Sequence, residues 1–183
     1  MIKIDKRKLK RKLIPSQIFF LSLAGSIIYQ QISTKAGDSI YKKFLKLFGR
    51  RKPTPELFLE LSEKILRSAG LSNQKFSYLK DLAKKFLDNT IDPRLFYKMS
   101  DKEVRGHLVQ VKGIGPWTSD MFLIFALNRP NILPVGDLGI AKGFQKVFNL
   151  KVLPNERKMR NLAKPYCGEY SYLALYLWQS NDE

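Results

Sequence analysis

The sequence predicts an all-α fold, and three observations lead to that prediction. Apolar residues recur every three to four positions along most of the chain. Ser, Thr, Asp or Pro precedes most of these segments, where such residues cap or start helices. No segment shows sustained period-2 alternation with β-branched enrichment, as strands would require. About ten short helices fit a chain of this length.

The first helix is expected after Pro15-Ser16, in an apolar run that a basic segment precedes. This order imitates a secretory signal. However, polar residues recur every fourth position at Ser22, Ser26 and Gln30, which indicates a buried helix with a narrow polar stripe. The run is also too short to span a bilayer. We therefore predict a core helix behind a basic flexible tail over residues 1–14.

Capping residues predict the helices that follow. Starts are expected at Ser33-Thr34, Pro53 to Glu56, Ser62-Glu63, Ser72 or Asn73, Asp92-Pro93 and Ser100-Asp101, with stops at Gly49 and Gly70. Glu103 follows Ser100 by three residues, as in a capping box. A further helix is expected over 138–148.

The charge of the chain predicts a polyanionic partner. Thirty-three Lys and Arg against sixteen Asp and Glu give a net charge of +17, far more than solubility requires. Nucleic acid is the first expectation and an anionic membrane surface the second. Lys and Glu enrichment in proteins from hot habitats raises both signs together, which is not the case here.

One cysteine, Cys167, and one histidine, His107, exclude a four-cysteine iron-sulfur cluster and a zinc site built from Cys and His within this chain. We assign neither residue a role and expect no catalytic metal. A reducing cytoplasm is consistent with this cysteine content, with association to the nucleoid if the source is prokaryotic. No membrane association and a monomeric state are expected.

The most informative stretch is a glycine-rich turn between two helical segments, Val111-Lys112-Gly113-Ile114-Gly115-Pro116-Trp117. Proline after glycine at a helix start leaves N–H groups pointing outward at the positive helix end, a geometry that holds a phosphate. Ile114 is expected to anchor the turn in the protein. Gly113 and Gly115 would let a DNA backbone approach without a Cβ. By itself such a turn is more often a simple connection.

About twenty residues later, Gly136-Asp137 stands before an amphipathic segment. This spacing, with the turn from Val111 to Thr118, resembles the helix-hairpin-helix GPD superfamily of DNA glycosylases, in its 3-methyladenine DNA glycosylase II branch. Supporting matches are Gln30 to Ser33, Leu71 to Lys75 and Tyr172 to Trp178. The resemblance covers about residues 15 to 180.

The resemblance implies one unit over residues 15–183, a compact bilobal helical bundle with a cleft between its lobes. Lobe one would span about 37–136, and lobe two would combine 15–36 with 137–183. It further implies a partner, double-stranded DNA with alkylated bases, and a reaction, the removal of such bases in base excision repair.

The resemblance also implies site residues. Asp137 would be the catalytic carboxylate, and Gln31 would enter the gap left by the flipped nucleotide. The base pocket would include Trp117, Met121 and Trp178. The DNA contacts would come from Lys112, Gly113, Ile114, Gly115 and Thr118. No organic cofactor is implied; a structural Na⁺ or K⁺ at the backbone of Val109, Val111 and Ile114 is compatible with the family.

The residues themselves fit this chemistry. Breaking an N-glycosidic bond builds positive charge on the sugar, which a fixed carboxylate stabilises. Asp137 at the start of the helix over 138–148 would be held ionised by the helix dipole. Considered alone, Asp137 would more often be a plain N-cap, and the two roles are compatible. An alkylated purine is cationic and already a good leaving group, so no general acid is needed.

Trp117 occupies the hairpin position where bifunctional relatives carry the lysine that forms a Schiff base. Because tryptophan cannot do this, we predict a monofunctional enzyme that leaves an intact abasic site. Two alternatives remain open from sequence. One is a non-catalytic helix-hairpin-helix DNA-binding module. The carboxylate of Asp137 argues against it, because a negative charge near phosphates weakens DNA binding. The other is a glycosylase for deaminated bases such as hypoxanthine.

Overall fold

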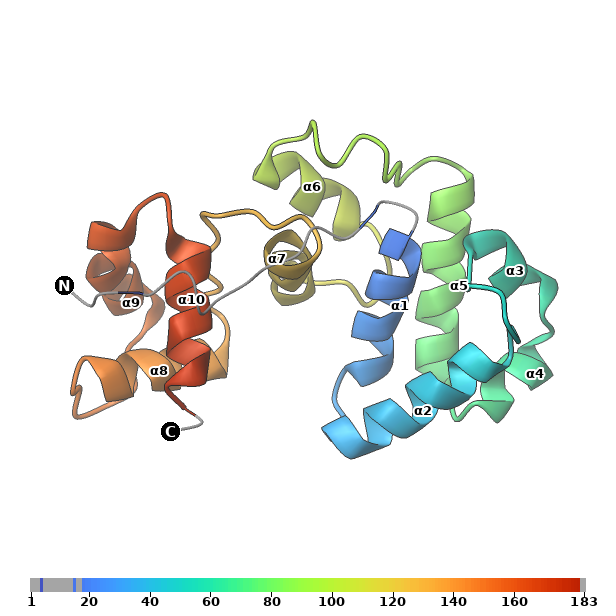
Figure 1. Cartoon of the computed structure of the whole chain (residues 1–183), viewed down its shortest axis with the longest axis horizontal. Helices are drawn as coiled ribbons and strands as arrows, with labels where there is room; N and C mark the ends of the chain where they lie inside the picture. Colours follow the sequence, from blue (N-terminus) through green and yellow to red (C-terminus); the bar gives the residue numbers. More distant parts are fainter. Residues whose placement is uncertain (1–3, 5–14, 16–17, 182–183) are drawn as a thin grey trace. The chain divides into compact units, whose positions relative to one another are not determined.

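The structure is a computed structural model that describes residue 4, residue 15 and residues 18–181. Apart from Ile4, the basic tail expected over residues 1–14 lies outside the described residues. The described part of the chain is helical and contains no β-strand, which confirms the predicted all-α class. Its α-helices, labelled in Figure 1, are α1 (Phe19–Tyr29), α2 (Thr34–Lys46), α3 (Pro55–Glu60), α4 (Glu63–Ser68), α5 (Asn73–Leu87), α6 (Asp101–Leu108), α7 (Pro116–Phe125), α8 (Leu138–Val147), α9 (Glu156–Ala163) and α10 (Tyr170–Gln179).

Short polar side chains set most of the helix starts. Ser33, Thr54, Ser62 and Ser72 each accept a hydrogen bond from the backbone N–H three residues later, as N-caps do. At α6 the predicted capping box is present: the Ser100 hydroxyl accepts the Glu103 N–H, and the Glu103 carboxylate accepts the Ser100 N–H.

The helix expected from Asp92-Pro93 is wrong. Residues 93–98 form turns instead. The carboxylate of Asp92 accepts hydrogen bonds from both the backbone N–H and the guanidinium of Arg94. A short polar side chain that bonds the backbone two residues ahead competes with helix formation.

The chain divides into two units, which we describe separately. The hairpin unit is Ile14–Ser119 and contains α1 to α6 and the start of α7; the C-terminal unit contains Asp120–Glu183 and α8 to α10. Two units agree with the bilobal expectation, but the boundaries differ. Helix α1, which we expected in the lobe with the C-terminal helices, packs on α2 and α5 of the hairpin unit.

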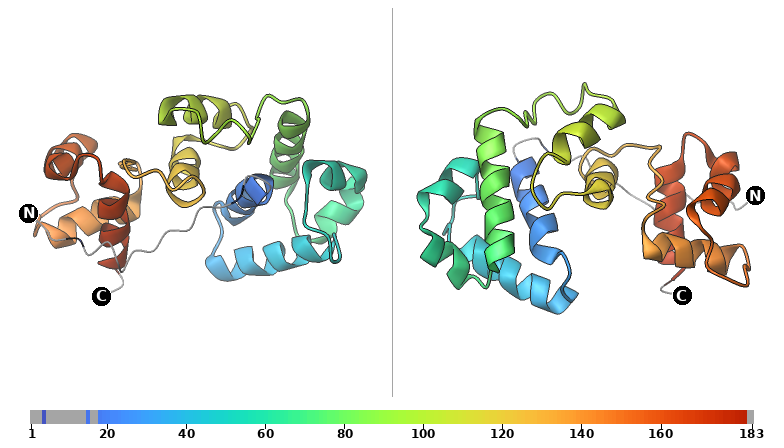
Figure 2. Two further views of the ribbon diagram at one scale, coloured as in Figure 1. Left: turned by 45° about the horizontal axis from the view of Figure 1, so that its top comes forward. Right: turned by 180° about the vertical axis from the view of Figure 1, so that it is seen from behind.

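The core of the hairpin unit forms around α1 and α5, which lie side by side with α3 and α4 along the other side of α5 (Figures 1 and 2). Phe19, Leu23 and Ile27 of α1 are fully buried, so the apolar run is a core helix, as predicted. The ring of Phe20 meets the rings of Phe58 and Phe86 edge-on. This packing fixes the two ends of α1, and the end at Tyr29 leads into the turn that carries Gln31.

The C-terminal unit has its own hydrophobic core between α8, α9 and α10 (Figure 2). Ile140 and Phe144 of α8 are buried against Leu173, Ala174 and Leu177 of α10, in a cluster that also contains Met159 and Tyr166. Burying each of these large side chains contributes about 1.5–3 kcal/mol. The packing of α8 on α10 holds the first residue before α8, Asp137, beside the last turn of α10.

Candidate functional site

The hairpin is the loop 109–115 that joins α6 to α7. Ile114 is only 4% exposed and its N–H donates to the carbonyl of Val111, so it anchors the loop in the protein, as predicted. Lys112 is exposed. At Gly115 an added Cβ would meet nothing within 4 Å. The solvent-facing side of the hairpin therefore contains Lys112 and Gly115 at the positive end of α7.

Gly113 is exposed in the hairpin and has an unusual backbone conformation. Its φ of +80° lies in the left-handed region, and an added Cβ would collide with the ring of Tyr78. A side chain at this exposed position would thus collide with the ring of Tyr78 of α5. Glycine is required here by the turn and by its contact with Tyr78.

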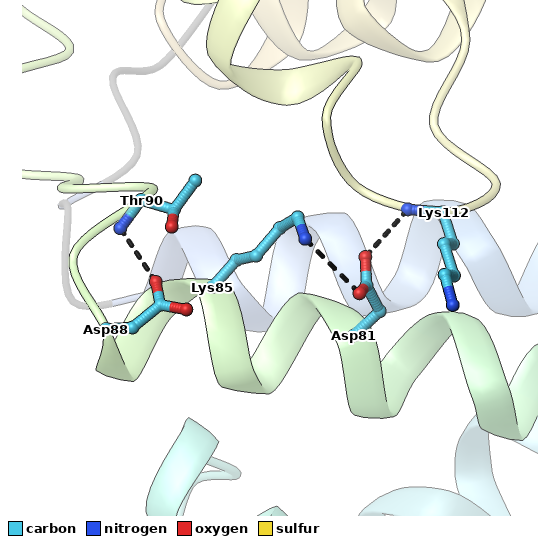
Figure 3. Close-up of polar contacts among 5 residues, drawn as sticks. All are labelled: Asp81, Lys85, Asp88, Thr90 and Lys112. Atoms are coloured by element: carbon cyan, nitrogen blue, oxygen red, sulfur yellow. Dashed lines mark hydrogen bonds and ion pairs between the residues drawn. The ribbon is translucent and has the colours of Figure 1, made fainter.

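An acidic side chain of α5 holds the hairpin backbone, as Figure 3 shows. Asp81 Oδ2 accepts a hydrogen bond from the backbone N–H of Lys112 at 2.8 Å. Its other oxygen, Oδ1, lies 3.3 Å from Lys85 Nζ. With only 17% of its side chain exposed, Asp81 is well placed to fix the turn, and Lys85 offsets its charge.

The α1–α2 turn lies against the same hairpin. Gln30 Nε2 donates to the carbonyl of Gly113 at 2.8 Å and lies 3.4 Å from the hydroxyl oxygen of Thr118. Gln31 beside it is exposed, and its φ of +56° lies in the left-handed region. Thr118, predicted to contact DNA, is 4% exposed and supports Gln30 from inside.

Asp137 is the N-cap of α8 in the C-terminal unit. Its Oδ1 accepts two hydrogen bonds, from the backbone N–H of Ile140 at 2.8 Å and from Trp178 Nε1 at 2.9 Å. The expected N-cap role is thus present, with a side-chain donor added to it. A Cβ at Gly139 would lie 3.0 Å from both Asp137 Oδ1 and Trp178 Cδ1, so glycine there leaves room for the bond.

Two further bonds fasten the ends of α8 and α10 to each other. Lys146 Nζ donates to the carbonyl of Ser180 at 2.6 Å, and Asn181 Nδ2 donates to the carbonyl of Gly139 at 2.9 Å. The loop before Asp137 is held as well: buried Ser171 accepts the N–H of Ile132 and donates to the carbonyl of Arg129. Asp137 and Trp178 therefore have little freedom to separate.

The aromatic surroundings of Asp137 come from α7 and α10. The ring of Trp178 stacks on Phe125, with centroids 5.8 Å apart and an angle of 27°. Phe125 is 47% exposed, and half-buried Met121 precedes it by four residues on the same face of α7. Trp117, also 47% exposed, is four residues earlier on that face but belongs to the hairpin unit.

The structure gives His107 and Cys167 ordinary places. His107 Nδ1 lies 2.9 Å from the carbonyl of Thr90, and Cys167 is an exposed free thiol. Within the described part of the chain, no three His, Cys, Asp or Glu side chains are grouped so that they could hold a metal ion. Among the described helices, none has the length and apolarity needed to cross a membrane.

No role was predicted from the sequence for four contributors to these regions: Gln30, Tyr78, Asp81 and Phe125. The partners in their contacts are far apart in sequence, by 83 residues for Gln30 and Gly113 and by 31 for Asp81 and Lys112. No local pattern signals such pairs. Phe125 alone could have been found, because it continues the i, i+4 series of Trp117 and Met121.

Comparison with known proteins identifies the family. The model of the HhH-GPD superfamily base excision DNA repair proteins matches residues 24–168. The chain belongs to this superfamily. It is 36% identical over 179 residues to a DNA-3-methyladenine glycosylase of Saccharomyces cerevisiae, covering 90% of this chain and 60% of that protein. A DNA-3-methyladenine glycosylase of Schizosaccharomyces pombe is 30% identical over 161 residues, with 87% of this chain and 71% of the relative covered.

Solved structures give the same result. The S. pombe 3-methyladenine DNA glycosylase in complex with abasic DNA matches with a TM-score of 0.83 and 28% identity, covering 100% of this chain and 93% of that one. A DNA-3-methyladenine glycosidase from Bacillus halodurans matches with a TM-score of 0.85 and 29% identity, over 93% and 78% of the two chains. A Bacillus subtilis relative is 31% identical to the chain over 160 residues, and the chain spans 56% of that relative's length. The chain therefore corresponds to part of that longer protein.

Proposed function

We propose that this protein is a monofunctional DNA glycosylase that hydrolyses the N-glycosidic bond of alkylated purines such as 3-methyladenine in duplex DNA and so initiates base excision repair. One observation carries the proposal: Asp137, fixed by two N–H donors on one oxygen, lies next to the stacked pair Phe125 and Trp178. The names of the relatives, which are 3-methyladenine glycosylases, support the same substrate class.

Asp137 supplies the charge for the reaction. When the bond between C1′ and the base nitrogen breaks, its electron pair leaves with the base and positive charge develops at C1′. A carboxylate that is already oriented stabilises this charge without having to reorganise. Trp178 and Ile140 provide that orientation. Water then adds to C1′ and its proton passes to bulk solvent, so that an abasic sugar remains.

The aromatic pair selects the base. An alkylated purine carries positive charge and is attracted to the face of an electron-rich ring, by about 2 kcal/mol when both are desolvated. Phe125 and Trp178 offer such rings beside Asp137, with Met121 on the same face of α7 as Phe125. Because loss of the base neutralises it, the attraction ends with the reaction and does not hold the product.

DNA binding is assigned to the hairpin unit. The positive end of α7 with Lys112 and Gly115 would hold a phosphate, and Gln31 would enter the gap left when the damaged nucleotide flips out. Exposed cations also cluster in a stretch with no Asp or Glu, which is typical of surfaces that contact a phosphate backbone: Lys42, Lys43, Lys46, Arg50, Arg51 and Lys52.

A monovalent cation, Na⁺ or K⁺, would suit the hairpin carbonyls of Val109, Val111 and Ile114. Carbonyl oxygens are hard ligands that bind hard cations. Val109 is the C-cap residue of α6, and the carbonyl of Val111, which accepts the Ile114 N–H, has a second lone pair. Bound there, the ion would add positive charge facing a DNA phosphate.

The test is release of 3-methyladenine from methylated duplex DNA by the wild type, Asp137→Asn and Asp88→Asn. Asparagine at 137 keeps an oxygen for the Ile140 N–H but loses the charge, so we expect release to fall by about 10²–10³-fold while DNA binding remains. Asp88 is the matched control, because its carboxylate also accepts a backbone N–H, from Thr90, at an exposed turn (Figure 3).

Three outcomes would contradict the proposal. Undiminished release by Asp137→Asn would remove Asp137 from the reaction. Absence of release by the wild type from alkylated, deaminated and oxidised DNA would favour a non-catalytic DNA-binding module. Strand cleavage with a borohydride-trapped covalent adduct would show a Schiff-base mechanism and contradict the monofunctional assignment.

A further inference from the structure

We propose that Gln30 is a positioning residue that fixes the α1–α2 turn to the hairpin, while Asp81 fixes the same hairpin to α5. Together they set the distance between the residue that enters the DNA, Gln31, and the loop that holds a phosphate. This inference rests on the proposed function, because it assigns a role to contacts between two DNA-binding elements. It concerns the hairpin unit alone.

Gln30 connects the two elements directly. Its amide nitrogen donates to the carbonyl of Gly113 in the hairpin at 2.8 Å and lies 3.4 Å from the hydroxyl oxygen of Thr118 in the first turn of α7. Its neighbour Gln31 is exposed. Any movement of Gln31 relative to the hairpin must therefore stretch or break the bonds made by the preceding residue.

Helix α5 supports the hairpin through side chains on one of its faces. Its residues Gln74, Tyr78, Asp81 and Lys85 follow the spacing i, i+4, i+7, i+11 and so lie on one face. From that face, the ring of Tyr78 packs under Gly113 and the carboxylate of Asp81 accepts the Lys112 N–H. Gln74 donates to the hydroxyl of Tyr78 at 2.7 Å, which orients the ring.

The α1–α2 turn has its own link to α5. Lys75 Nζ donates to the carbonyl of Ile28 at the end of α1, at 2.6 Å. This amine is half-buried, and the burial lowers the pKa of Lys75. The turn with Gln31 and the hairpin are thus both fastened to α5, and Gln30 links them to each other.

The consequence is a fixed distance between Gln31, which would fill the gap in the base stack, and the hairpin, which would hold a phosphate. Extruding a nucleotide requires that a side chain fill the gap in the base stack while the neighbouring phosphate is held. Both interactions form together only if their spacing matches the DNA before binding, since misplacement of about 1 Å is costly. If the bond between Gln30 and the hairpin were lost, contacts to undamaged duplex DNA would remain. The preference for DNA that has a gap in its base stack would become weaker.

The experiment compares the binding of two DNA probes, an undamaged duplex and the same duplex with a tetrahydrofuran abasic site. The proteins are the wild type, Gln30→Met and Gln110→Met. Methionine keeps the length of glutamine but cannot donate. Gln110 is the matched control: it lies in the same loop 109–115, but its amide donates to the carbonyl of Gly106 in α6 and so links the hairpin to neither the α1–α2 turn nor α5.

We expect Gln30→Met to bind the undamaged duplex like the wild type and to lose about 2- to 10-fold of the preference for abasic DNA, the range of one or two hydrogen bonds. Gln110→Met should retain the full preference. A merely structural role for Gln30 would lower both affinities together with the thermal midpoint. Equal preference in Gln30→Met and Gln110→Met would overturn the inference.

Asp81 gives an independent second measurement. Asp81→Asn keeps an oxygen for the Lys112 N–H and should retain the preference for abasic DNA, with somewhat tighter binding to both probes because a negative charge is removed. Asp81→Leu removes the acceptor and should lose the preference. If Leu and Asn behave alike, the bond to Lys112 does not position the hairpin.

The two probes separate this inference from the proposed function, because neither duplex contains an alkylated base that could be released. If the wild type prefers abasic DNA but releases no alkylated base, the proposed reaction is contradicted. The comparison of Gln30→Met with Gln110→Met would then still test the role of Gln30. A wild type with no preference for abasic DNA would overturn the inference even if base release were observed.

Discussion

The hairpin and the Asp137 region use hydrogen bonds for different purposes. In the hairpin, the side chains of Gln30 and Asp81 bond backbone groups and so fix the path of the main chain. Around Asp137, a backbone N–H and the indole of Trp178 bond a carboxylate and so fix a charge. One region depends on shape and the other on the orientation of a single side chain.

This difference predicts how each region responds to substitution. A region that works through backbone shape should lose stability together with DNA binding when a substitution alters φ or crowds the loop. A region that works through one charge should lose rate while stability and DNA binding are retained. The following changes, from the largest expected effect to the smallest, test that distinction.

Trp178→Phe should lower the rate of base release by about 10- to 100-fold, because a hydrogen bond to a charged group is worth about 1.5–3 kcal/mol. Phenylalanine can still stack on Phe125, so DNA binding and the thermal midpoint should change little. Single-turnover kinetics measure the effect. Tyr176→Phe on the same helix is the control and should leave the rate unchanged; a rate loss of equal size there would remove the distinction between the two regions.

Gly113→Ala should destabilise the hairpin by about 1–3 kcal/mol, because alanine is strained at a φ of +80° and its Cβ would meet the ring of Tyr78. Urea denaturation and DNA affinity should both report the loss. Gly115→Ala, where an added Cβ meets nothing, should change stability by less than about 0.5 kcal/mol. If Gly115→Ala nevertheless weakens DNA binding, the DNA backbone approaches the hairpin at Gly115.

Glu103→Gln should reduce the acid sensitivity of the hairpin unit by a small amount. Hydrogen bonds from the Ser100 hydroxyl and N–H hold the pKa of Glu103 below its ordinary value of 4.5. A carboxylate with a lowered folded pKa stabilises the protein above its unfolded pKa, and this contribution is lost as pH falls through the folded pKa. Urea midpoints at about pH 6 and about pH 3 should therefore differ less in Glu103→Gln than in the wild type.

Ser100→Ala provides the companion measurement, because it removes the hydroxyl that bonds the same carboxylate. It should reduce the difference between the two pH values in the same direction. A variant pair with unchanged pH dependence would show that this capping box does not contribute to the acid sensitivity of α6.

The sequence by itself determined the local structure. Helix starts at Ser33, Thr54, Ser62, Ser72 and Ser100 were predictable because an N-cap bonds a backbone group three residues away. The same locality made Ile114 recognisable as the anchor of the hairpin and Asp137 as an N-cap, whereas the expected catalytic role of Asp137 came only from the family resemblance. The failure at Asp92-Pro93 has a local cause as well, since the side chain of Asp92 bonds Arg94 and ends the helical path.

Only the tertiary structure decided what those local elements meet. Trp178 reaches Asp137 across 41 residues, Asp81 reaches Lys112 across 31, and Gln30 reaches Gly113 across 83. The assignment of α1 to the hairpin unit and the contact of Gly113 with Tyr78 likewise depend on how helices pack. Hydrogen bonds and van der Waals contacts act over a few ångströms in space, so a linear pattern specifies them only where neighbours in space are also neighbours in sequence.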